Sequence, residues 1–186
     1  HYGNLTKKFY DVIQCINCSL TKLKDFPKID YSSSSYRESY NQSSSVNNYI
    51  KLHDSEQSPR INRIGIEKFR NKIVLDYGCG GGSFLDAIKG VAKHTIAIEP
   101  FEGFHDSLQK RGHEVFKYAK DAKVYKSKID VIISFGVIEH LKDPLGMIKE
   151  VYMLLRKNGK LYIETDNLGE ILMRFDIPEF NQFFYR

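Results

Sequence analysis

Long apolar runs are missing from this sequence of 186 residues. Runs such as Val131–Ser134 and Val151–Leu155 fall far short of the roughly 20 apolar residues that a membrane-spanning helix requires. The first residues, HYGNLTKKFYD, also lack the apolar core of a secretory signal. The sequence therefore predicts a protein without a membrane span, located in the cytoplasm.

Cysteine is scarce as well, since Cys15, Cys18 and Cys79 are the only three. Three cysteines do not make a disulfide framework, and they suit a reducing compartment. A tetrahedral structural zinc site needs four ligands, of which Cys15 and Cys18 supply two. His1 and His53 are poor candidates for the others, because no second close pair is present. We therefore expect no bound metal.

A dense stripe of positive charge is missing too, although the net charge is +5. The lysines are scattered along the chain, with a mild cluster at residues 117–128. Scattered lysines are typical of a solvated surface, whereas nucleic-acid binding needs charge gathered at the contact. The charge pattern therefore favours a small-molecule partner over a nucleic acid.

Short apolar runs alternate with helical patterns from Asn71 onward. Runs typical of buried strands occupy residues 72–77, 95–100, 114–118, 129–134 and 159–166. Such runs, separated by helices, indicate a mostly parallel sheet with helices on both faces, which is a doubly wound α/β fold. In this fold ligands bind beyond the carboxyl ends of the strands.

Helices are expected at residues 83–92, 104–112, 144–159 and 168–175. Ser83 is the expected N-cap of the first, and Gly112 ends the second. Pro144 opens the third, which Asn158–Gly159 is expected to stop. The pattern ends soon after the fifth strand. Either the sheet lacks its last strands, or a partner covers the aromatic end FNQFFYR.

The first 57 residues differ in character and are expected to form an N-terminal knuckle or lid, followed by the main domain at 58–186. Residues 9–20 predict a hairpin or knuckle, and the Ser-, Asn- and Tyr-rich stretch 30–49 predicts a linker or lid. Ser58-Pro59 is expected to open a helix, which would pack Ile61, Ile64 and Phe69 on the sheet.

Four glycines occupy five positions in the stretch VLDYGCGGGSF, directly after the first strand. Gly78, Gly80 and Gly82 form a G-x-G-x-G pattern, which lets a ligand lie against bare backbone near a helix N-terminus. Glu99 ends the next strand 21 residues after Gly78, which is about the spacing at which a carboxylate binds ribose hydroxyls. Together these features predict an adenosine-like cofactor.

The glycine loop fits two other classes of nucleotide-binding site, those for dinucleotides and for nucleoside triphosphates, less well. The dinucleotide fingerprint has a glycine where this chain has Ser83, and no G-x-x-x-x-G-K-[ST] motif is present. Asp76 would repel a pyrophosphate but suits a ligand with an ammonium or sulfonium charge. An NAD(P)-dependent Rossmann oxidoreductase is kept as an alternative.

The motifs VLDYGCGGGSF, IAIEP, IDVIISFGVIEHLKDP and LLRKNGKLYIETDN, in this order, resemble those of class I S-adenosylmethionine-dependent methyltransferases. The resemblance covers residues 71–167. It implies a Rossmann-like methyltransferase fold with S-adenosylmethionine as the cofactor. The N-terminal VIQCINCSL and DYSSSSYRESY are similar to the start of zinc-knuckle methyltransferases, including sugar C-methyltransferases. The implied acceptor is therefore a small polar metabolite, such as a sugar or cell-surface glycan precursor, or a quinone-like phenol, methylated on oxygen or carbon.

The resemblance also implies a role for each matching position. The glycine loop would line the methionine and ribose parts of the cofactor, Glu99 would bind the ribose hydroxyls, and the next two residues would lie by the adenine. Three residues after the fourth strand would flank the methionine. The full implied cofactor set is Asp76, Gly78, Cys79, Gly80, Gly82, Glu99, Pro100, Phe101, Phe135, Gly136 and Val137. Cys79 is expected to be a small residue beside the backbone and not a nucleophile.

An oxygen or carbon acceptor loses a proton on methylation, so a general base that titrates near neutrality helps. His140, after the fourth strand, is the best-placed histidine; the alternative is that it only joins its loop to the next helix. Tyr31, Tyr36 and Tyr40 would cover the cofactor or acceptor if their segment folds over the site. A nucleic-acid methyltransferase is a further alternative, although no N/D-P-P-Y/F motif follows the fourth strand.

Overall fold

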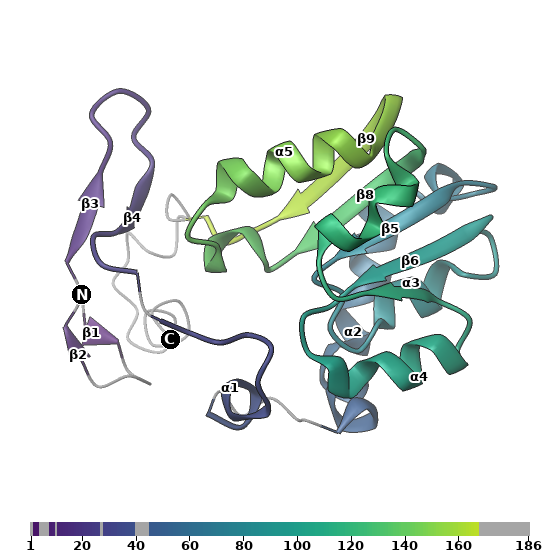
Figure 1. Ribbon diagram of the computed structural model, residues 1–186, viewed down its shortest axis with the longest axis horizontal. Coiled ribbons are helices and arrows are strands. Elements are labelled where there is room, and N and C mark those ends of the chain that lie inside the picture. The colour runs from purple at the N-terminus through teal and green to yellow at the C-terminus, as the bar shows by residue number, and fades with distance from the viewer. Residues whose placement is uncertain (1, 4–7, 10, 27, 40–44, 168–186) are drawn as a thin grey trace. The chain divides into compact units, whose positions relative to one another are not determined.

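The computed structural model describes residues 2–3, 8–9, 11–26, 28–39 and 45–167 (Figure 1). The chain divides into two compact units, one of residues 1–29 with 166–186 and one of residues 30–165. Within the described residues, no helix has both the length and the apolar character needed to cross a membrane. The predicted helix at 168–175, the end FNQFFYR and Tyr40 lie outside the described residues.

The first unit contains two short antiparallel strand pairs, β1 (Tyr2–Gly3) with β2 (Lys8–Phe9) and β3 (Val12–Gln14) with β4 (Thr21–Leu23). The second pair is a hairpin at residues 12–23, so its second strand lies beyond the range 9–20 in which a hairpin or knuckle was expected. Its turn carries Cys15 and Cys18, which are both exposed. Among the described residues, no group of three or more His, Cys, Asp or Glu side chains is placed to hold a metal ion.

The second unit is built on a parallel sheet of five strands in the order β7-β6-β5-β8-β9. The strands are β5 (Ile73–Tyr77), β6 (His94–Ile98), β7 (Glu114–Phe116), β8 (Ile129–Phe135) and β9 (Leu155–Glu164). The chain winds outward from β5 to β7 and then returns to add β8 on the other side. The strand order therefore reverses between β5 and β8, and the doubly wound α/β prediction is confirmed.

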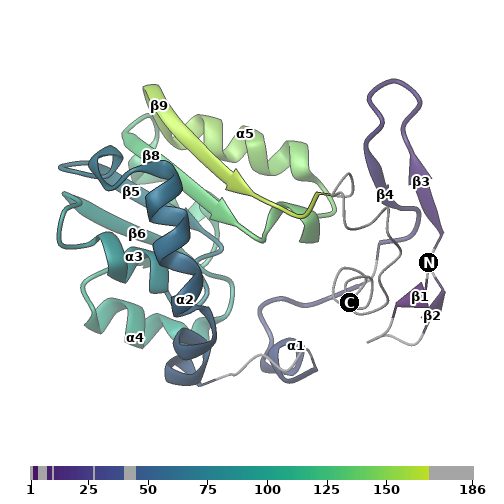
Figure 2. The same cartoon turned by 180° about the vertical axis from the view of Figure 1, so that it is seen from behind.

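Helices cover both faces of this sheet. Figure 1 shows α5 (Pro144–Leu154) on the face toward the viewer, and Figure 2, seen from behind, shows α2 (Val46–Ile64) on the other. The remaining helices are α1 (Ser34–Ser39), α3 (Ser83–Ile88) and α4 (His105–Lys110), with short 3-10 turns η1 (Ile66–Lys68), η2 (Glu102–Phe104), η3 (Ala119–Tyr125) and η4 (Ile138–His140).

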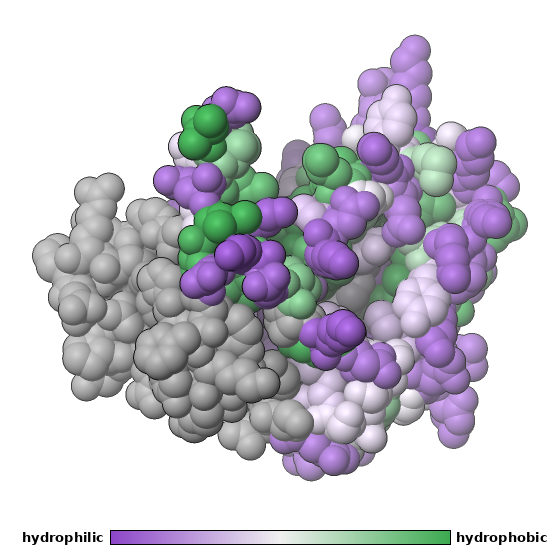
Figure 3. All heavy atoms as spheres, turned by 60° about the vertical axis from the view of Figure 1, so that its left-hand side comes forward, coloured by the Kyte–Doolittle hydropathy of each residue, from purple (hydrophilic) through white to green (hydrophobic). Residues whose placement is uncertain are grey.

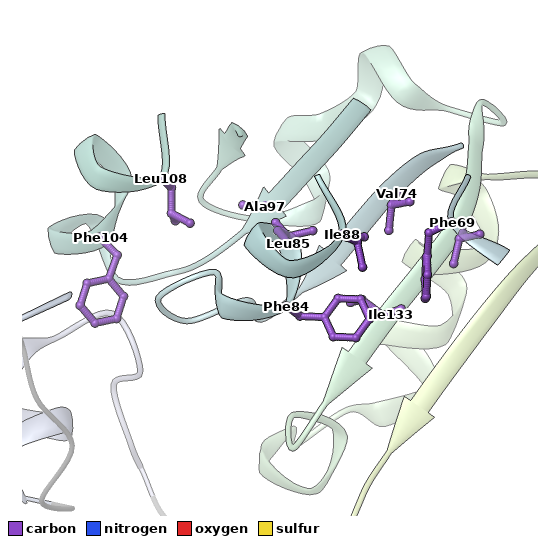
Figure 4. Packing of buried hydrophobic residues seen from close by; sticks show 10 residues of the cluster. Phe69, Val74, Phe84, Leu85, Ile88, Ala97, Phe104, Leu108 and Ile133 are labelled. Carbon is purple, nitrogen blue, oxygen red and sulfur yellow. The ribbon is translucent and has the colours of Figure 1, made fainter. Parts of the chain in front are cut away.

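Alternate residues of the strands enter two separate apolar layers, because successive side chains of a strand point to opposite faces. Val74 and Ile133 join the layer beneath α3 and α4, where Figure 4 shows Phe84, Leu85 and Ile88 of α3 turned toward the strands. The opposite layer, beneath α5 and η3, includes Leu75, Ile96, Ile132, Met147 and Val151. On the face drawn in Figure 3, hydrophilic residues make up most of the described surface.

The predicted start of the long helix is wrong. We expected Ser58-Pro59 to open it, but α2 begins at Val46 and contains Pro59 in its interior. Packing outweighs the hydrogen bond that proline removes, because Tyr49 near one end of the helix and Ile61 near the other both pack against the buried layer. The expected packing of Ile61, Ile64 and Phe69 is confirmed.

The linker prediction for residues 30–49 is also wrong in part, since α1 and the start of α2 lie inside this stretch. Composition alone did not reveal that Arg37 is buried. Buried contacts, rather than helix propensity, order these residues.

Two helix ends differ from expectation as well. Gly82, with φ 84°, is the N-cap of α3, so Ser83 is its first residue. α5 ends at Leu154, and Asn158–Gly159 lies within β9 instead. Asn158 has φ 64°, and the pairing of β8 with β9 shifts register between Ile129 and Val131. The Asn-Gly pair therefore marks a backbone irregularity in the strand, not a helix stop.

Candidate cofactor and acceptor site

The candidate site lies where β5, β6 and β8 end. These strands are neighbours in register, since Asp76 of β5 pairs with Ala97 of β6 and Ile133 of β8. Parallel strands leave the sheet at the same edge, so the glycine loop, Glu99 and the loop after β8 meet there. The fold thus brings together the three segments that contain all the predicted cofactor residues.

The glycine loop is fixed to β6 by its backbone. The amides of Gly78 and Cys79 both donate to the carbonyl of Ile98, at 2.8 and 3.1 Å. Gly78 has φ 81°, and a Cβ atom there would lie 2.5 Å from Val137 Cγ2. Glycine is therefore required at position 78 by both backbone conformation and space, and the loop touches the β8 loop directly.

Glu99 is a buried carboxylate held by two backbone amides. Its Oε2 accepts a hydrogen bond from the Gly80 amide at 2.8 Å, and its Oε1 accepts one from the Phe101 amide at 2.8 Å. The side chain is only 4% exposed. Burial raises the pKa of Glu99, while the charge of Arg37 and the two amides oppose that rise. The carboxylate is thus fixed in position directly beside the glycine loop.

Arg37 of α1 is a third partner of the Glu99 carboxylate. Its Nη2 donates to Glu99 Oε1 at 2.7 Å, and its own side chain is 5% exposed. The guanidinium carbon lies 4.4 Å from the ring centre of Phe104, 4.9 Å from that of Phe101 and 5.0 Å from that of Tyr49. A buried cation is stabilised here by one carboxylate and by three aromatic rings.

Asp76 is a second buried carboxylate, one strand away from Glu99. Burial raises its pKa to about 7, and the negative charge of Glu99 adds to the rise, whereas Arg60 lowers it. An acidic group with such a pKa exists in both protonation states near neutrality. It can therefore accept a cationic ligand group by releasing its proton.

Burial also raises the pKa of the Cys79 thiol well above its usual range, and the carboxylates of Asp76 and Glu99 raise it further. A thiol in this environment stays protonated at neutral pH. This agrees with the expectation that Cys79 is not a nucleophile.

The loop after β8 forms the other side of the site. The Phe135 ring packs against Phe84 of α3 at 5.2 Å, and the Arg60 guanidinium lies 4.9 Å from its ring centre. Arg60 in turn donates to Glu164 Oε1 from Nη2 at 2.5 Å and from Nε at 2.9 Å. Gly136, with φ 62°, donates its amide to the Glu164 carbonyl at 2.9 Å.

His140 lies at the end of η4 and is exposed. Its ring centre is 5.7 Å from that of Tyr31, which is 4.7 Å from the ring centre of Tyr36. The segment at 30–39 therefore places Tyr31 beside the predicted base and Tyr36 against Tyr31. Nearby, the Thr165 hydroxyl donates to Glu139 Oε2 at 3.1 Å.

A polar network supports the glycine loop from behind. Arg111 donates from Nη2 to the Gly81 carbonyl at 2.6 Å and forms an ion pair with Asp86 of α3. His113, which has a fully buried side chain, bridges Asp86 Oδ1 at 3.2 Å and Thr95 Oγ1 at 2.8 Å. Burial would raise the pKa of Asp86, but hydrogen bonds from His113 and Lys89, with the charge of Arg111, lower it to about 2. Asp86 is therefore ionised and keeps Arg111 in place.

Several residues of this site were not predicted, including Arg37, Tyr49, Arg60 and Arg111. Tyr49 packs on the glycine loop so closely that a Cβ atom on Gly80 would lie 2.6 Å from its ring. Pro100, which was predicted, is half-buried and joins Glu99 to Phe101. The Ser-rich composition around Arg37 concealed that residue, the misplaced start of α2 concealed Tyr49, and no local motif marks Arg60 or Arg111.

Residues 50–177 match the family described as "Methyltransferase domain". Among curated proteins, the chain is 29% identical over 112 residues to a tRNA U34 carboxymethyltransferase of Pseudoalteromonas atlantica, which covers 54% of this chain and 33% of that protein. It is 32% identical over 109 residues to a ubiquinone biosynthesis O-methyltransferase of Histophilus somni, covering 52% of this chain and 45% of that protein. The chain thus spans less than half the length of these relatives.

A solved structure of an S-adenosylmethionine-dependent methyltransferase from Archaeoglobus fulgidus is similar in fold, with a TM-score of 0.54 and 22% identity. The match covers 80% of this chain and 70% of that one. The expected Rossmann-like methyltransferase fold is confirmed, and so, at the level of the family, are the enzyme class and its S-adenosylmethionine cofactor. The narrower similarity to zinc-knuckle and quinone-type enzymes stays a prediction. With more than half of its length matched, the chain belongs to the methyltransferase domain family.

Proposed function

We propose that this chain binds S-adenosylmethionine at the glycine loop and at Glu99, and that it methylates an oxygen or carbon of a small polar metabolite. The observation that carries the proposal is the buried Glu99 carboxylate, which the amides of Gly80 and Phe101 hold at the end of β6. A fixed carboxylate at this strand end suits the two hydroxyls of a ribose. Gly78 and Gly80 present no side chain of their own to a ligand, and Val137 and Tyr49 lie against them in this structure.

The charges around the loop favour a cationic ligand over a dinucleotide. Asp76 and Glu99 are both buried at this edge of the sheet. A pyrophosphate placed against them would meet two like charges in a region of low dielectric. An ammonium or sulfonium group would meet opposite charges instead, so the ionised form of Asp76 would be stabilised by the ligand.

Methyl transfer of this kind is an in-line displacement, in which the acceptor–methyl bond forms while the carbon–sulfur bond breaks and its electron pair stays on sulfur. The bound cofactor supplies the activated methyl group. The protein's part is to orient the acceptor and to take its proton. His140 is the proposed base, because it is exposed at the end of η4 and lies beside the Tyr31 ring.

The proposed acceptor is a sugar or cell-surface glycan precursor, with a quinone-like phenol as the nearest related class. The name of the Histophilus somni relative, a ubiquinone biosynthesis O-methyltransferase, favours oxygen as the accepting atom. The cluster of the half-buried Tyr31 and Tyr36 rings with the exposed His140 ring suits the face of a sugar or aromatic ring.

Isothermal calorimetry with S-adenosylhomocysteine and with NAD⁺ tests the cofactor part of the proposal. We expect micromolar binding of S-adenosylhomocysteine and no binding of NAD⁺. Binding of NAD⁺ alone would favour the oxidoreductase reading and overturn the proposal.

A methyl-transfer assay with labelled cofactor tests the acceptor part, using nucleotide sugars, a catechol and bulk tRNA side by side. The tRNA arm is included because one relative is named a tRNA U34 carboxymethyltransferase. We expect label in the nucleotide-sugar or catechol arm. Label in tRNA, lost steeply with added salt, would make the nucleic-acid alternative the better one.

A further inference from the structure

Glu99 is already fully engaged on one of its two oxygens. An ionised carboxylate offers about four acceptor positions, two on each oxygen. Oε1 accepts from the Phe101 amide and from Arg37 Nη2, and Oε2 accepts from the Gly80 amide. A ribose diol that binds both oxygens at once needs one open position on each. Oε2 has such a position, whereas Oε1 does not.

The three bonds to Glu99 differ in how easily they can be broken. The amides of Gly80 and Phe101 belong to backbone that is held by the β5–β6 junction. Arg37 instead comes from α1, a six-residue helix that is 62 residues distant from Glu99 in the chain. A side-chain bond from a short helix can be given up without unfolding the sheet. Arg37 is therefore the contact that an entering ribose would replace.

The surroundings of the Arg37 guanidinium also suit a flat ring. Phe101 and Phe104 stand edge to face, with ring centres 5.0 Å apart and planes at 89°, and Tyr49 packs 5.1 Å from Phe104. The guanidinium occupies the space beside all three rings. A planar, cationic guanidinium and a planar purine are both favoured by aromatic faces.

We propose that Arg37 is a displaceable internal ligand of the cofactor site, which occupies on Glu99 Oε1 the position that a ribose hydroxyl takes when the cofactor binds. The inference rests on the proposed function and adds to it a residue that opposes cofactor binding. In the ligand-free protein, Arg37 neutralises the buried Glu99 carboxylate. On binding, the guanidinium leaves Oε1, and the ammonium group of the cofactor brings positive charge back to the same edge of the sheet.

Calorimetry on Arg37→Met tests the proposal, because methionine keeps much of the apolar packing but makes no bond to Glu99. We expect S-adenosylhomocysteine to bind at least about 10-fold more tightly than to wild type, since one charge-assisted bond no longer has to be broken. Arg156→Met is the matched control. Arg156 pairs with Asp130 near the start of β8, away from the site, at 2.6 Å, so its loss should leave the affinity unchanged.

The outcomes separate this inference from the proposed function. Tighter binding to Arg37→Met, or binding to Arg37→Met alone, supports both. Binding to wild type that is unchanged or weaker in Arg37→Met overturns the inference and leaves the proposed function standing. Absence of binding to either protein overturns both.

A measurement on the unmodified chain covers the case in which Arg37→Met does not fold. In protein labelled with ¹⁵N-arginine, the Arg37 side-chain resonance is assigned by its loss in Arg37→Lys. We expect saturating S-adenosylhomocysteine to shift or abolish that resonance. An Arg37 resonance that stays in place at saturation overturns the inference.

Discussion

The two sides of the candidate site are built in different ways. On the proposed cofactor side, after β5 and β6, the candidate groups are a carboxylate that is 4% exposed and the two backbone amides that hold it. On the acceptor side, after β8, His140 is exposed and contacts the ring of a residue from a distant segment. A site held by buried backbone can serve one cofactor across many proteins, whereas exposed side chains can change with the acceptor.

The largest expected effect is on the cofactor side. Glu99→Gln removes the charge that a ribose diol would meet, so the affinity for S-adenosylhomocysteine should fall about 100-fold, as expected for lost charge-assisted hydrogen bonds. Calorimetry measures it. The matched control is Glu114→Gln, at the start of β7, where the carboxylate bonds Tyr125 and His94 instead. An affinity within about 3-fold of wild type would show that Glu99 does not hold the ligand.

Substitution of His140, on the proposed acceptor side, should lower the turnover number and leave the cofactor affinity unchanged. His140→Gln removes the proposed base, so kcat should fall about 100-fold while the Kd of S-adenosylhomocysteine stays the same. His94→Gln, near the start of β6, is the control and should leave both unchanged. If His140→Gln keeps full turnover at every pH, His140 has only a structural role.

The raised pKa of Asp76 should make both the stability of the fold and the affinity for the cofactor depend on pH. Its pKa is raised from 3.8 to about 7, so the ligand-free fold favours the protonated form. The stability that this group contributes is full below pH 3.8 and is lost as the pH rises through about 7. A cationic ligand favours the ionised form, so the affinity should rise up to about 10-fold per pH unit below that pKa and level off above it.

Calorimetry from pH 5.5 to 8.5 measures this dependence, in buffers of different ionisation enthalpy that also report proton release. Asp76→Asn should flatten the profile. A wild-type profile that is already flat would mean that Asp76 does not titrate on binding.

A side chain should be tolerated at Gly90, which lies outside the glycine loop, but not at Gly80 within it. Gly80 has φ 54°, and a Cβ atom there would lie 2.6 Å from the Tyr49 ring. Gly80→Ala should weaken S-adenosylhomocysteine binding about 10-fold and lower the free energy of unfolding by about 1–2 kcal/mol. Gly90 has no atom within 4 Å of its Cβ position, so Gly90→Ala is the control and should change neither quantity. Equal behaviour of the two variants would contradict the close approach at Gly80.

The smallest effect on cofactor affinity is expected for Arg111, which lies behind the glycine loop. Arg111→Ala removes the donor to the carbonyl of Gly81, a residue outside the predicted cofactor set, so cofactor affinity should fall only about 3-fold. Urea unfolding should show a larger change, because Asp86 loses its ion pair with Arg111. A 100-fold loss of affinity would instead place Arg111 in direct contact with the ligand.

The same division explains what the sequence could reveal. Glycines and a carboxylate spaced along two neighbouring strands are a local pattern, so Gly78, Gly80 and Glu99 could be read directly. Arg37 and Arg60 come from distant parts of the sequence, since Arg37 is 62 positions from Glu99 and Arg60 is 104 positions from Glu164. Their roles depend on how α1 and α2 dock on the sheet, which no local spacing encodes.

A crystal structure of the protein with S-adenosylhomocysteine tests the central claim most directly. We predict that the two ribose hydroxyls donate to the two oxygens of Glu99, while the amides of Gly80 and Phe101 keep their bonds to the same carboxylate. A ligand seated elsewhere, with Glu99 still facing Arg37, would contradict the account.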